Sequence, residues 1–385
     1  MVLERGDNMV LERLDRALAT HSWLALNPIT RVQCIRSNAS NHYPIIINPE
    51  GVADRTCKPF RFKHMWLKEN GCGDTVKAAW LSPFPVSSSS LMHEKIKLCG
   101  VKLMEWSKQS FGSVRKQLEE KSKFLEKAEF AAAQGADYET LRLLRVEVNE
   151  LLDKESLMWQ QRARALHLKC GDKNTRFFHN KASQRFRRNR IVGLLDDSNS
   201  WCTNTTQVAD IIVGFYTRLF TSERPTTDHG VLEVIQSIVT EEMNSNLTRD
   251  FTKQEVDLVL KEMAPLKASG LDGMPPLFFQ SFWPLIGDEV SKVVLDCLNS
   301  CHIPKEFNYT YVTLIPKVKN PEFFFEFRPI SLCNVIYKLI SKVLANRLKP
   351  LLPSIVSENQ SAFQAGRVIT NNILMTFETL HYMKT

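Results

Sequence analysis

No run of apolar residues in the 385-residue chain approaches the ~18–20 that a membrane-spanning helix needs. The charged N-terminal stretch MVLERGDNMVLERLDR lacks the apolar core of a secretion signal. The nine cysteines are an odd number and include no C-x-x-C pair, which disfavours both a disulfide framework and a zinc site. We therefore expect a reduced, non-secreted protein of the nucleus or cytoplasm, without membrane contact and without a structural metal.

Acidic residues are almost missing from one stretch of 29 residues. Between Arg162 and Arg190, ten lysines and arginines face a single acid, Asp172, which gives this stretch a net charge of +9. The whole chain carries +8, so the remainder sums to −1. Such cations can neutralise phosphates, and the interleaved aromatic rings can stack on unpaired bases. The candidate nucleic-acid-binding residues are Arg162, Arg164, Lys169, Lys173, Arg176, Lys181, Arg185, Arg187, Arg188 and Arg190.

The alternative for this basic stretch is a solvated helix face whose phenylalanines enter the core. Phe177 and Phe178 are adjacent, so we expect at least one of them to be buried. Just downstream, the pair Asp196-Asp197 has the residue types of a metal-binding turn in a polymerase. It lies in the sequence DDSNS, which is common in turns, and we interpret it as an ordinary turn.

Composition and periodicity predict an α+β chain. Long stretches rich in Lys, Glu, Leu and Ala predict two helices, over 91–132 and 138–170, that form a helical hairpin. The β-rich runs VQCIRS (32–37) and YPIIIN (43–48) predict strands near the N-terminus. Further expected elements are a β-hairpin over 190–201, strands over 310–316 and 327–332, and helices over 204–220, 252–263, 277–300 and 334–350, with an apolar helical stripe over 371–385.

Several unusual strings follow one another in the C-terminal third. They are PLKASGLDG (265–273), LIPK (314–317), FRPISL (327–332), KLISKVLANRL (338–348), ENQSAF (358–363) and Gly366-Arg367. In this order and spacing they closely resemble the fingers region of reverse transcriptases from LINE-type (non-LTR) retrotransposons, especially the plant kind. Upstream, GDKNTRFF (171–178) and GLLDD (193–197) resemble the segment that joins endonuclease to polymerase in those polyproteins. SNHYPI (40–45) resembles the terminal motif of their apurinic-type endonuclease.

The resemblance implies a division of the chain into five segments. An endonuclease remnant covers 1–50, a linker 51–90, and a helical basic connector 91–190. A hairpin and helices over 191–258 lead into the polymerase, whose fingers begin at 259 and continue to 385. The implied activity is RNA-directed DNA synthesis by target-primed reverse transcription. The implied partners are an RNA template, a DNA primer or target and a deoxynucleoside triphosphate; the oligomeric state stays open.

Two cations near the fingers strings are the candidate nucleotide ligands. Lys317 ends one expected strand and Arg328 begins the next, so an antiparallel hairpin could bring both to one triphosphate. The alternative for Arg328 is a structural ion pair with Glu326. The resemblance implies template contacts for two further groups, although a simple turn capped by Asp272 is an alternative for the first. These groups are Lys267, Gly270, Asp272 and Gly273, and Gln360, Phe363, Gly366 and Arg367.

The chain departs from the family in its carboxylates. No aspartate follows Asp296, so the palm aspartates that hold the family's Mg²⁺ have no counterpart there. His42 matches the catalytic histidine of the endonuclease, but Asn41 replaces the aspartate beside it. We therefore expect these 385 residues to be a fragment of a reverse transcriptase that does not polymerise by itself. The alternatives are a non-catalytic nucleic-acid-binding remnant and, less favoured, an endonuclease-type phosphodiesterase.

Overall fold

A computed structural model of the chain describes most residues from Pro59 onward and short stretches before it. The described residues are 2–5, 8–11, 17–20, 23, 27, 30–34, 45–49, 59–83, 88–134, 138–163, 175–222, 238–319, 321–358, 360–361 and 366–383. The chain divides into two compact units, Met1–Pro59 and Phe60–Thr385, which are considered separately. Among the helices of these residues, none is long and apolar enough to cross a membrane.

The first unit contains two antiparallel hairpins. Strand β1 (Val2–Arg5) pairs with β2 (Asn8–Leu11), and β3 (Arg31–Cys34) pairs with β4 (Ile45–Asn48). The second hairpin confirms a strand in the described part of each of the two predicted runs, VQCIRS and YPIIIN. The candidate endonuclease residue His42 lies outside the described residues, as does Asn41.

One hydrophobic core holds the second unit together, and it draws on segments from both ends of that unit. Its central buried side chains include Trp66, Trp80, Phe278, Ile286 and Ile336. Most of the core residues lie in the 3₁₀ helix η1 (His64–Lys68), α2 (Asn70–Trp80), α3 (Ser88–Trp106), α10 (Lys253–Glu262), α11 (Pro276–Asn299) and α13 (Val335–Leu348).

Residues 60–80, expected to belong to a linker over 51–90, are part of this core. Phe62 meets Phe278 edge to face at 5.5 Å between ring centroids and meets Trp66 in the same way at 5.6 Å. The backbone N–H of Phe62 donates to the carbonyl of Gly273 at 3.1 Å. A reading of local composition cannot detect this packing, because Phe278 lies more than two hundred residues further along the chain.

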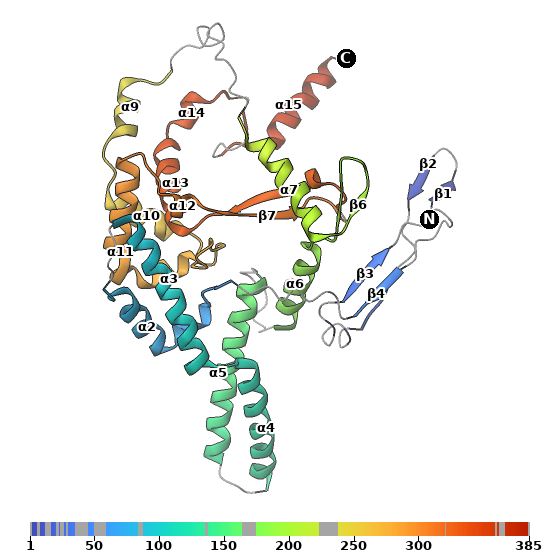
Figure 1. Ribbon diagram of the computed structural model, residues 1–385, viewed down its shortest axis with the longest axis vertical. Coiled ribbons are helices and arrows are strands. Elements are labelled where there is room, and N and C mark those ends of the chain that lie inside the picture. The colour runs from blue at the N-terminus through green and yellow to red at the C-terminus, as the bar shows by residue number, and fades with distance from the viewer. Residues whose placement is uncertain are drawn as a thin grey trace. The chain divides into compact units, whose positions relative to one another are not determined.

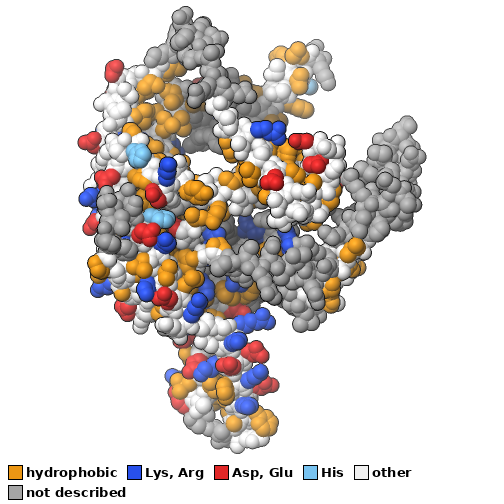
Figure 2. Space-filling model, viewed as in Figure 1, with side chains coloured by type: hydrophobic (Ala, Val, Ile, Leu, Met, Phe, Trp, Pro, Cys, Tyr) orange, Lys and Arg blue, Asp and Glu red, His pale blue; other side chains and the backbone are white. Residues whose placement is uncertain are grey.

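The predicted helical hairpin is formed by α4 (Val114–Ala133) and α5 (Tyr138–Ala163), which lie side by side (Figure 1). The prediction of one helix over 91–132 is wrong: α3 ends before a short π-helical turn (Ser107–Phe111), and α4 begins after Ser113. Gly112, with φ of 59°, supplies the left-handed residue that separates the helices. Figure 2 shows acidic and basic side chains mixed over the α4–α5 hairpin.

The remaining helices and strands lie close to their predicted positions. Strands β7 (Tyr311–Pro316) and β8 (Phe327–Leu332) form an antiparallel pair, as expected. So do β5 (Leu194–Leu195) and β6 (Trp201–Cys202). The other elements are α6 (Thr175–Arg188), α7 (Thr205–Phe220), α9 (Glu241–Thr248), α12 (Lys305–Asn308), the 3₁₀ helix η3 (Phe324–Glu326), α14 (Leu352–Ile355) and α15 (Ile369–Tyr382).

Candidate nucleic-acid interface

The β7–β8 hairpin brings the two candidate nucleotide ligands close in register. Ile315 is paired with Arg328, and the N–H of Lys317 donates to the carbonyl of Glu326 at 2.7 Å, one step beyond the last strand pair. Side chains two residues apart on a strand share a face, so Lys317 lies diagonally from Arg328 on the same side of the hairpin. The predicted antiparallel arrangement of these two strands is therefore confirmed, whereas the nucleotide role stays a prediction.

The two cations differ in what they contact. The Lys317 ammonium donates to the carbonyl of Phe325 at 2.8 Å. Arg328 is exposed, and its guanidinium has no ion pair or hydrogen bond within the described part of the chain. The alternative pairing with Glu326 is not formed, because that carboxylate accepts from the backbone N–H groups of Glu322 (2.7 Å) and Phe323 (3.1 Å). Arg328 is thus available for an anion.

Two glycines of the loop over 267–273 pack directly against the backbone of other segments. A methyl group at Gly270 would lie 2.5 Å from the Cα of Asn334. At Gly273, with φ of +72°, it would lie 2.2 Å from the carbonyl oxygen of Phe60. Both glycines are buried, whereas Lys267 and Leu271 are exposed. Of the loop residues predicted to contact template, Lys267 alone presents an exposed side chain; Gly270 and Gly273 shape the loop from within.

Polar contacts from distant segments hold this loop. Arg61 Nη1 donates to Ser269 Oγ at 2.7 Å and lies 3.4 Å from the carbonyl of Gly270. The ammonium of Lys338 donates to the carbonyl of Ala268. Sequence reasoning missed Arg61, and no local signal could have found it, because its partner is 208 residues away. Arg61 is therefore a positioning residue for the loop.

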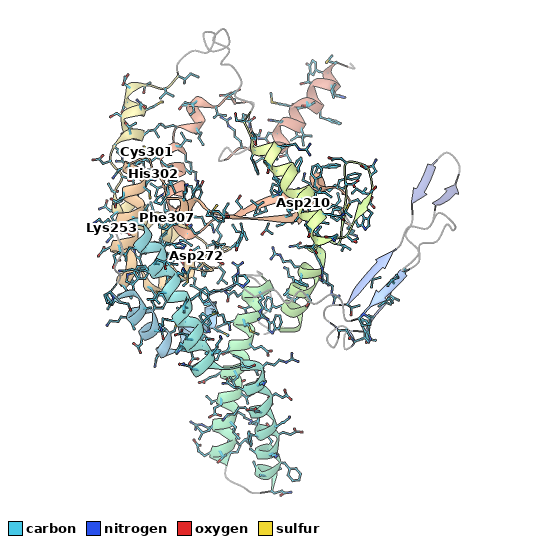
Figure 3. The ribbon with its side chains drawn as sticks, viewed as in Figure 1. Asp210, Lys253, Asp272, Cys301, His302 and Phe307 are labelled. Carbon is cyan, nitrogen blue, oxygen red and sulfur yellow. The ribbon has the colours of Figure 1, made fainter. Side chains whose placement is uncertain are left out.

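Asp272, which is labelled in Figure 3, makes a hydrogen bond within the loop. Its Oδ1 accepts from the N–H of Met274 at 3.0 Å, which is the turn arrangement considered as the alternative. Although the residue keeps some accessible surface, protein atoms surround the carboxylate. This burial raises the pKa of Asp272 from 3.8 to about 6, against the opposing effects of the Met274 hydrogen bond and of the nearby Lys338 and Arg61 charges.

The raised pKa predicts a pH-dependent cost of keeping Asp272 charged. The folded chain binds this proton more tightly than the unfolded chain, so stability falls as pH rises from about 4 through about 6. Asp272→Asn keeps the acceptor oxygen and removes the charge. We expect it to stabilise the protein by roughly 3 kcal/mol at pH 7.5 and to be neutral below about pH 4. Urea unfolding across this pH range measures the difference; a destabilised variant at pH 7.5 would contradict the assignment.

The stretch predicted to contact template at 360–367 is only partly described. Arg367 turns its guanidinium inward and donates to the carbonyls of Ser357 and, at 2.8 Å, Gln360. Gly366 has φ of +80°, a left-handed turn with no atom within 4 Å of an added methyl group. Phe363 lies outside the described residues. These bonds connect the Arg367 side chain to the backbone at Ser357 and Gln360.

Helix α6 carries the described part of the basic stretch. Phe178 is buried at 2% exposure, as expected for one of the adjacent pair, and its neighbour Phe177 is exposed. The Lys181 ammonium lies 5.5 Å from the ring centroid of Phe177, within cation–π range. Arg162, at the end of α5, lies similarly 5.0 Å from the ring of Trp159. The side chains of Arg164, Lys169, Lys173 and Arg176 lie outside the described residues.

The last turns of α6 present unpaired arginines to solvent. Arg185, Arg187 and Arg188 are exposed, and none of their guanidinium groups has a hydrogen bond or ion pair within the described residues. Residues 181, 185 and 188 share one face of the helix, because they are spaced at i, i+4 and i+7. Arg190 follows the helix and is half-buried. The exposed face of α6 (Lys181, Arg185 and Arg188), together with the exposed Arg187 on another side of the helix, is therefore suited to a polyanion.

The pair Asp196-Asp197, which follows β5, lies in a turn. Oδ1 of Asp196 accepts from the N–H groups of Ser198 at 2.9 Å and Ser200 at 2.8 Å. These two hydrogen bonds confirm the predicted turn. Within the described ranges, no three His, Cys, Asp or Glu side chains come together as metal ligands. The residues described thus do not fit the Mg²⁺ site that the resemblance implies.

Comparison with known proteins relates the chain to a transposon, although no protein-family model matches it. The chain is 27% identical over 242 residues to the "Transposon TX1 uncharacterized 149 kDa protein" of Xenopus laevis. The match covers 60% of this chain but only 18% of that relative. It supports an origin in a non-LTR (LINE-type) retrotransposon.

Proposed function

We propose that this chain is part of a LINE-type reverse transcriptase polyprotein and that its described region binds nucleic acid. The similarity to the TX1 transposon protein supports the retrotransposon origin. The order of the strings between 265 and 367 supports the polymerase assignment. The whole protein would perform RNA-directed DNA synthesis from a target primer, with an RNA template, a DNA primer and a deoxynucleoside triphosphate as partners.

The exposed face of α6 carries the nucleic-acid-binding part of the proposal. A helix face with only cations is unfavourable by itself, because like charges on adjacent turns repel one another. Phosphates relieve that repulsion and release counterions when the cations bind them. By contrast, several cations on the α4–α5 hairpin are paired with acids, as in Lys121–Glu147 at 2.7 Å and Arg145–Glu129 at 3.0 Å. The difference in pairing distinguishes a binding face from a solvated one.

The β7–β8 hairpin supports a nucleotide role for Lys317 and Arg328. Arg328 offers a planar, unpaired guanidinium, and a lysine one diagonal step away offers a point charge. A triphosphate would replace the Phe325 carbonyl as the acceptor for Lys317. Such a pair would offset the charge of the phosphates, whereas chemistry at the metal would need carboxylates other than those described.

Charge removal on α6 tests the proposal. For the triple variant Arg185→Gln, Arg187→Gln and Arg188→Gln, we expect weaker binding to RNA and DNA and a slope of log K against log[salt] lower by about 2. Each lost phosphate contact removes about 0.7–0.9 from that slope. Fluorescence anisotropy at about 50 to 200 mM salt measures it.

The matched control removes the same charge from the α4–α5 hairpin, through Lys123→Gln, Arg142→Gln and Arg145→Gln, which are exposed cations paired with glutamates. This control is expected to leave the slope nearly unchanged. Equal slopes for the α6 variant and the unmodified chain would reject α6 as the binding face.

A further inference from the structure

Three consecutive phenylalanines form the tip of the β7–β8 hairpin, and their rings take different directions. The ring of Phe324 packs on Phe215 of α7, with centroids 4.0 Å apart. Phe323 and Phe325 stack on each other, with centroids 5.1 Å apart and planes inclined by 13°. Phe325 remains 54% exposed. The stack therefore ends in an aromatic ring that faces solvent.

The backbone around this tip is held from several sides. The Glu326 carboxylate accepts from the N–H groups of Glu322 and Phe323. The Lys317 ammonium donates to the carbonyl of Phe325 itself. The N–H of Leu195 in β5 donates to the carbonyl of Glu322 at 2.8 Å. A fixed backbone lowers the entropy lost when a ligand orders the exposed ring.

The charge around the exposed ring is positive. Lys317, Lys319 and Arg328 all lie on the hairpin and are exposed. The hairpin has two acids. The Glu326 carboxylate accepts hydrogen bonds from backbone N–H groups, and the Glu322 side chain is half-buried. An apolar protein partner would have to desolvate these cations, whereas a strand of nucleic acid supplies both a π-face for the ring and phosphates for the cations.

We propose that Phe325 is a stacking platform for an unpaired base of a single-stranded nucleic acid, with Lys319 contacting an adjacent phosphate. A third aromatic ring, that of the base, would extend the stack of Phe323 and Phe325. Bases inside a duplex are already stacked on both faces, so the platform selects unpaired strand. The inference rests on the proposed nucleic-acid-binding function and specifies that the β7–β8 hairpin binds single-stranded nucleic acid.

Exposure of a phenylalanine is not enough to make such a platform. Phe124 on α4 is 57% exposed, nearly the same as Phe325. Phe124, however, lies on the α4–α5 hairpin, where acids and cations pair with each other; Lys123, the residue before it, pairs with Glu119. It therefore provides a matched control with equal exposure but with charges of both signs beside it.

The test compares Phe325→Leu with Phe124→Leu in the full chain. Binding is measured by fluorescence anisotropy with a labelled RNA of about 12 nucleotides, the DNA of the same sequence, and a blunt duplex. For Phe325→Leu we expect about tenfold weaker binding to single strands, no change for the duplex and an unchanged salt slope. Phe325→Trp is expected to restore binding. The RNA and DNA arms show which strand the platform prefers.

Several outcomes would overturn the inference. Unchanged single-strand affinity in Phe325→Leu would assign the ring to a protein contact, and an equal loss for Phe124→Leu would show a general effect of surface apolarity. An equal loss for the duplex would remove the selection for unpaired bases. If the α6 variant changes the salt slope while Phe325→Leu changes nothing, this inference fails and the proposed function stands. If the unmodified chain binds neither strand nor duplex, both fail.

Discussion

Replacing Arg347 with alanine is expected to lower the free energy of unfolding of the second unit by roughly 3–5 kcal/mol. The side chain is only 6% exposed. Its Nε donates to Glu255 Oε1 at 2.7 Å and its Nη2 to Glu255 Oε2 at 2.9 Å. The same guanidinium donates to the backbone carbonyls of Leu247 and Asp250 and lies 3.6 Å from the ring centroid of Phe251. Alanine would remove this donor from the two carbonyls and would leave the Glu255 carboxylate without its paired guanidinium.

Two companion variants separate charge from geometry. Arg347→Lys keeps the charge but cannot reproduce the two parallel bonds, so we expect it to lose more than half of the stability lost by alanine. Arg249 is exposed, and its Nη2 lies 3.7 Å from the Glu255 carboxylate, so it offsets the Glu255 charge only weakly. Arg249→Ala should therefore lower the free energy of unfolding only slightly. Urea unfolding followed by circular dichroism gives the values. A cost below about 1 kcal/mol for Arg347→Ala would place Arg347 among ordinary surface cations.

The same pair predicts a response to acid. The hydrogen bonds from Arg347 lower the pKa of Glu255 from 4.5 to about 2, with help from the N–H of Thr252. The folded chain therefore holds this proton more weakly than the unfolded chain, so the contribution is complete above about pH 4.5 and is lost as pH falls through about 2. The cost of Arg347→Ala should accordingly shrink between about pH 5 and about pH 2. If the loss of stability caused by Arg347→Ala does not change with pH, the packing of the side chain rather than its ion pair with Glu255 explains that loss.

Gly273→Ala is expected to be the most damaging small substitution, at about 2–5 kcal/mol. Two effects combine: the residue has φ of +72°, and its new methyl group would lie 2.2 Å from the Phe60 carbonyl oxygen. Because that oxygen belongs to the backbone beside Phe62, relief would require moving a segment that enters the core. The loss of stability is measured by thermal unfolding, together with faster hydrogen exchange at Met274.

Two other glycines serve as controls for Gly273. Gly366 also has a positive φ, of +80°, but nothing lies within 4 Å of an added methyl group, so alanine there should cost only about 1–2 kcal/mol. Gly214 is helical and equally open, so Gly214→Ala should stabilise by up to about 1 kcal/mol. Similar costs at 273 and 366 would show that backbone conformation alone, rather than the Phe60 contact, sets the effect.

Local chemistry was enough to predict most helices and strands. The run of apolar residues over 311–316 and 327–332 gave both strands of the β7–β8 hairpin, and the turn residues after Asp196 gave the β5–β6 turn. These features depend on neighbours within a few residues, which the sequence displays directly. The same holds for the basic stretch, since a nearly complete lack of acids leaves the cations of α6 without local partners. The roles of Lys317 and Arg328 toward a nucleotide stay predictions.

The tertiary structure alone decided which residues shape the candidate site. It placed residues 60–80 in the core, brought Arg61 to Ser269, and gave Arg367 and Asp272 hydrogen bonds to nearby backbone groups. It also exposed the ring of Phe325 while packing that of Phe324 against α7. Each outcome depends on a partner from another segment of the chain. Sequence reveals the composition of a segment, whereas its burial and its hydrogen-bond partners exist only once distant segments pack together.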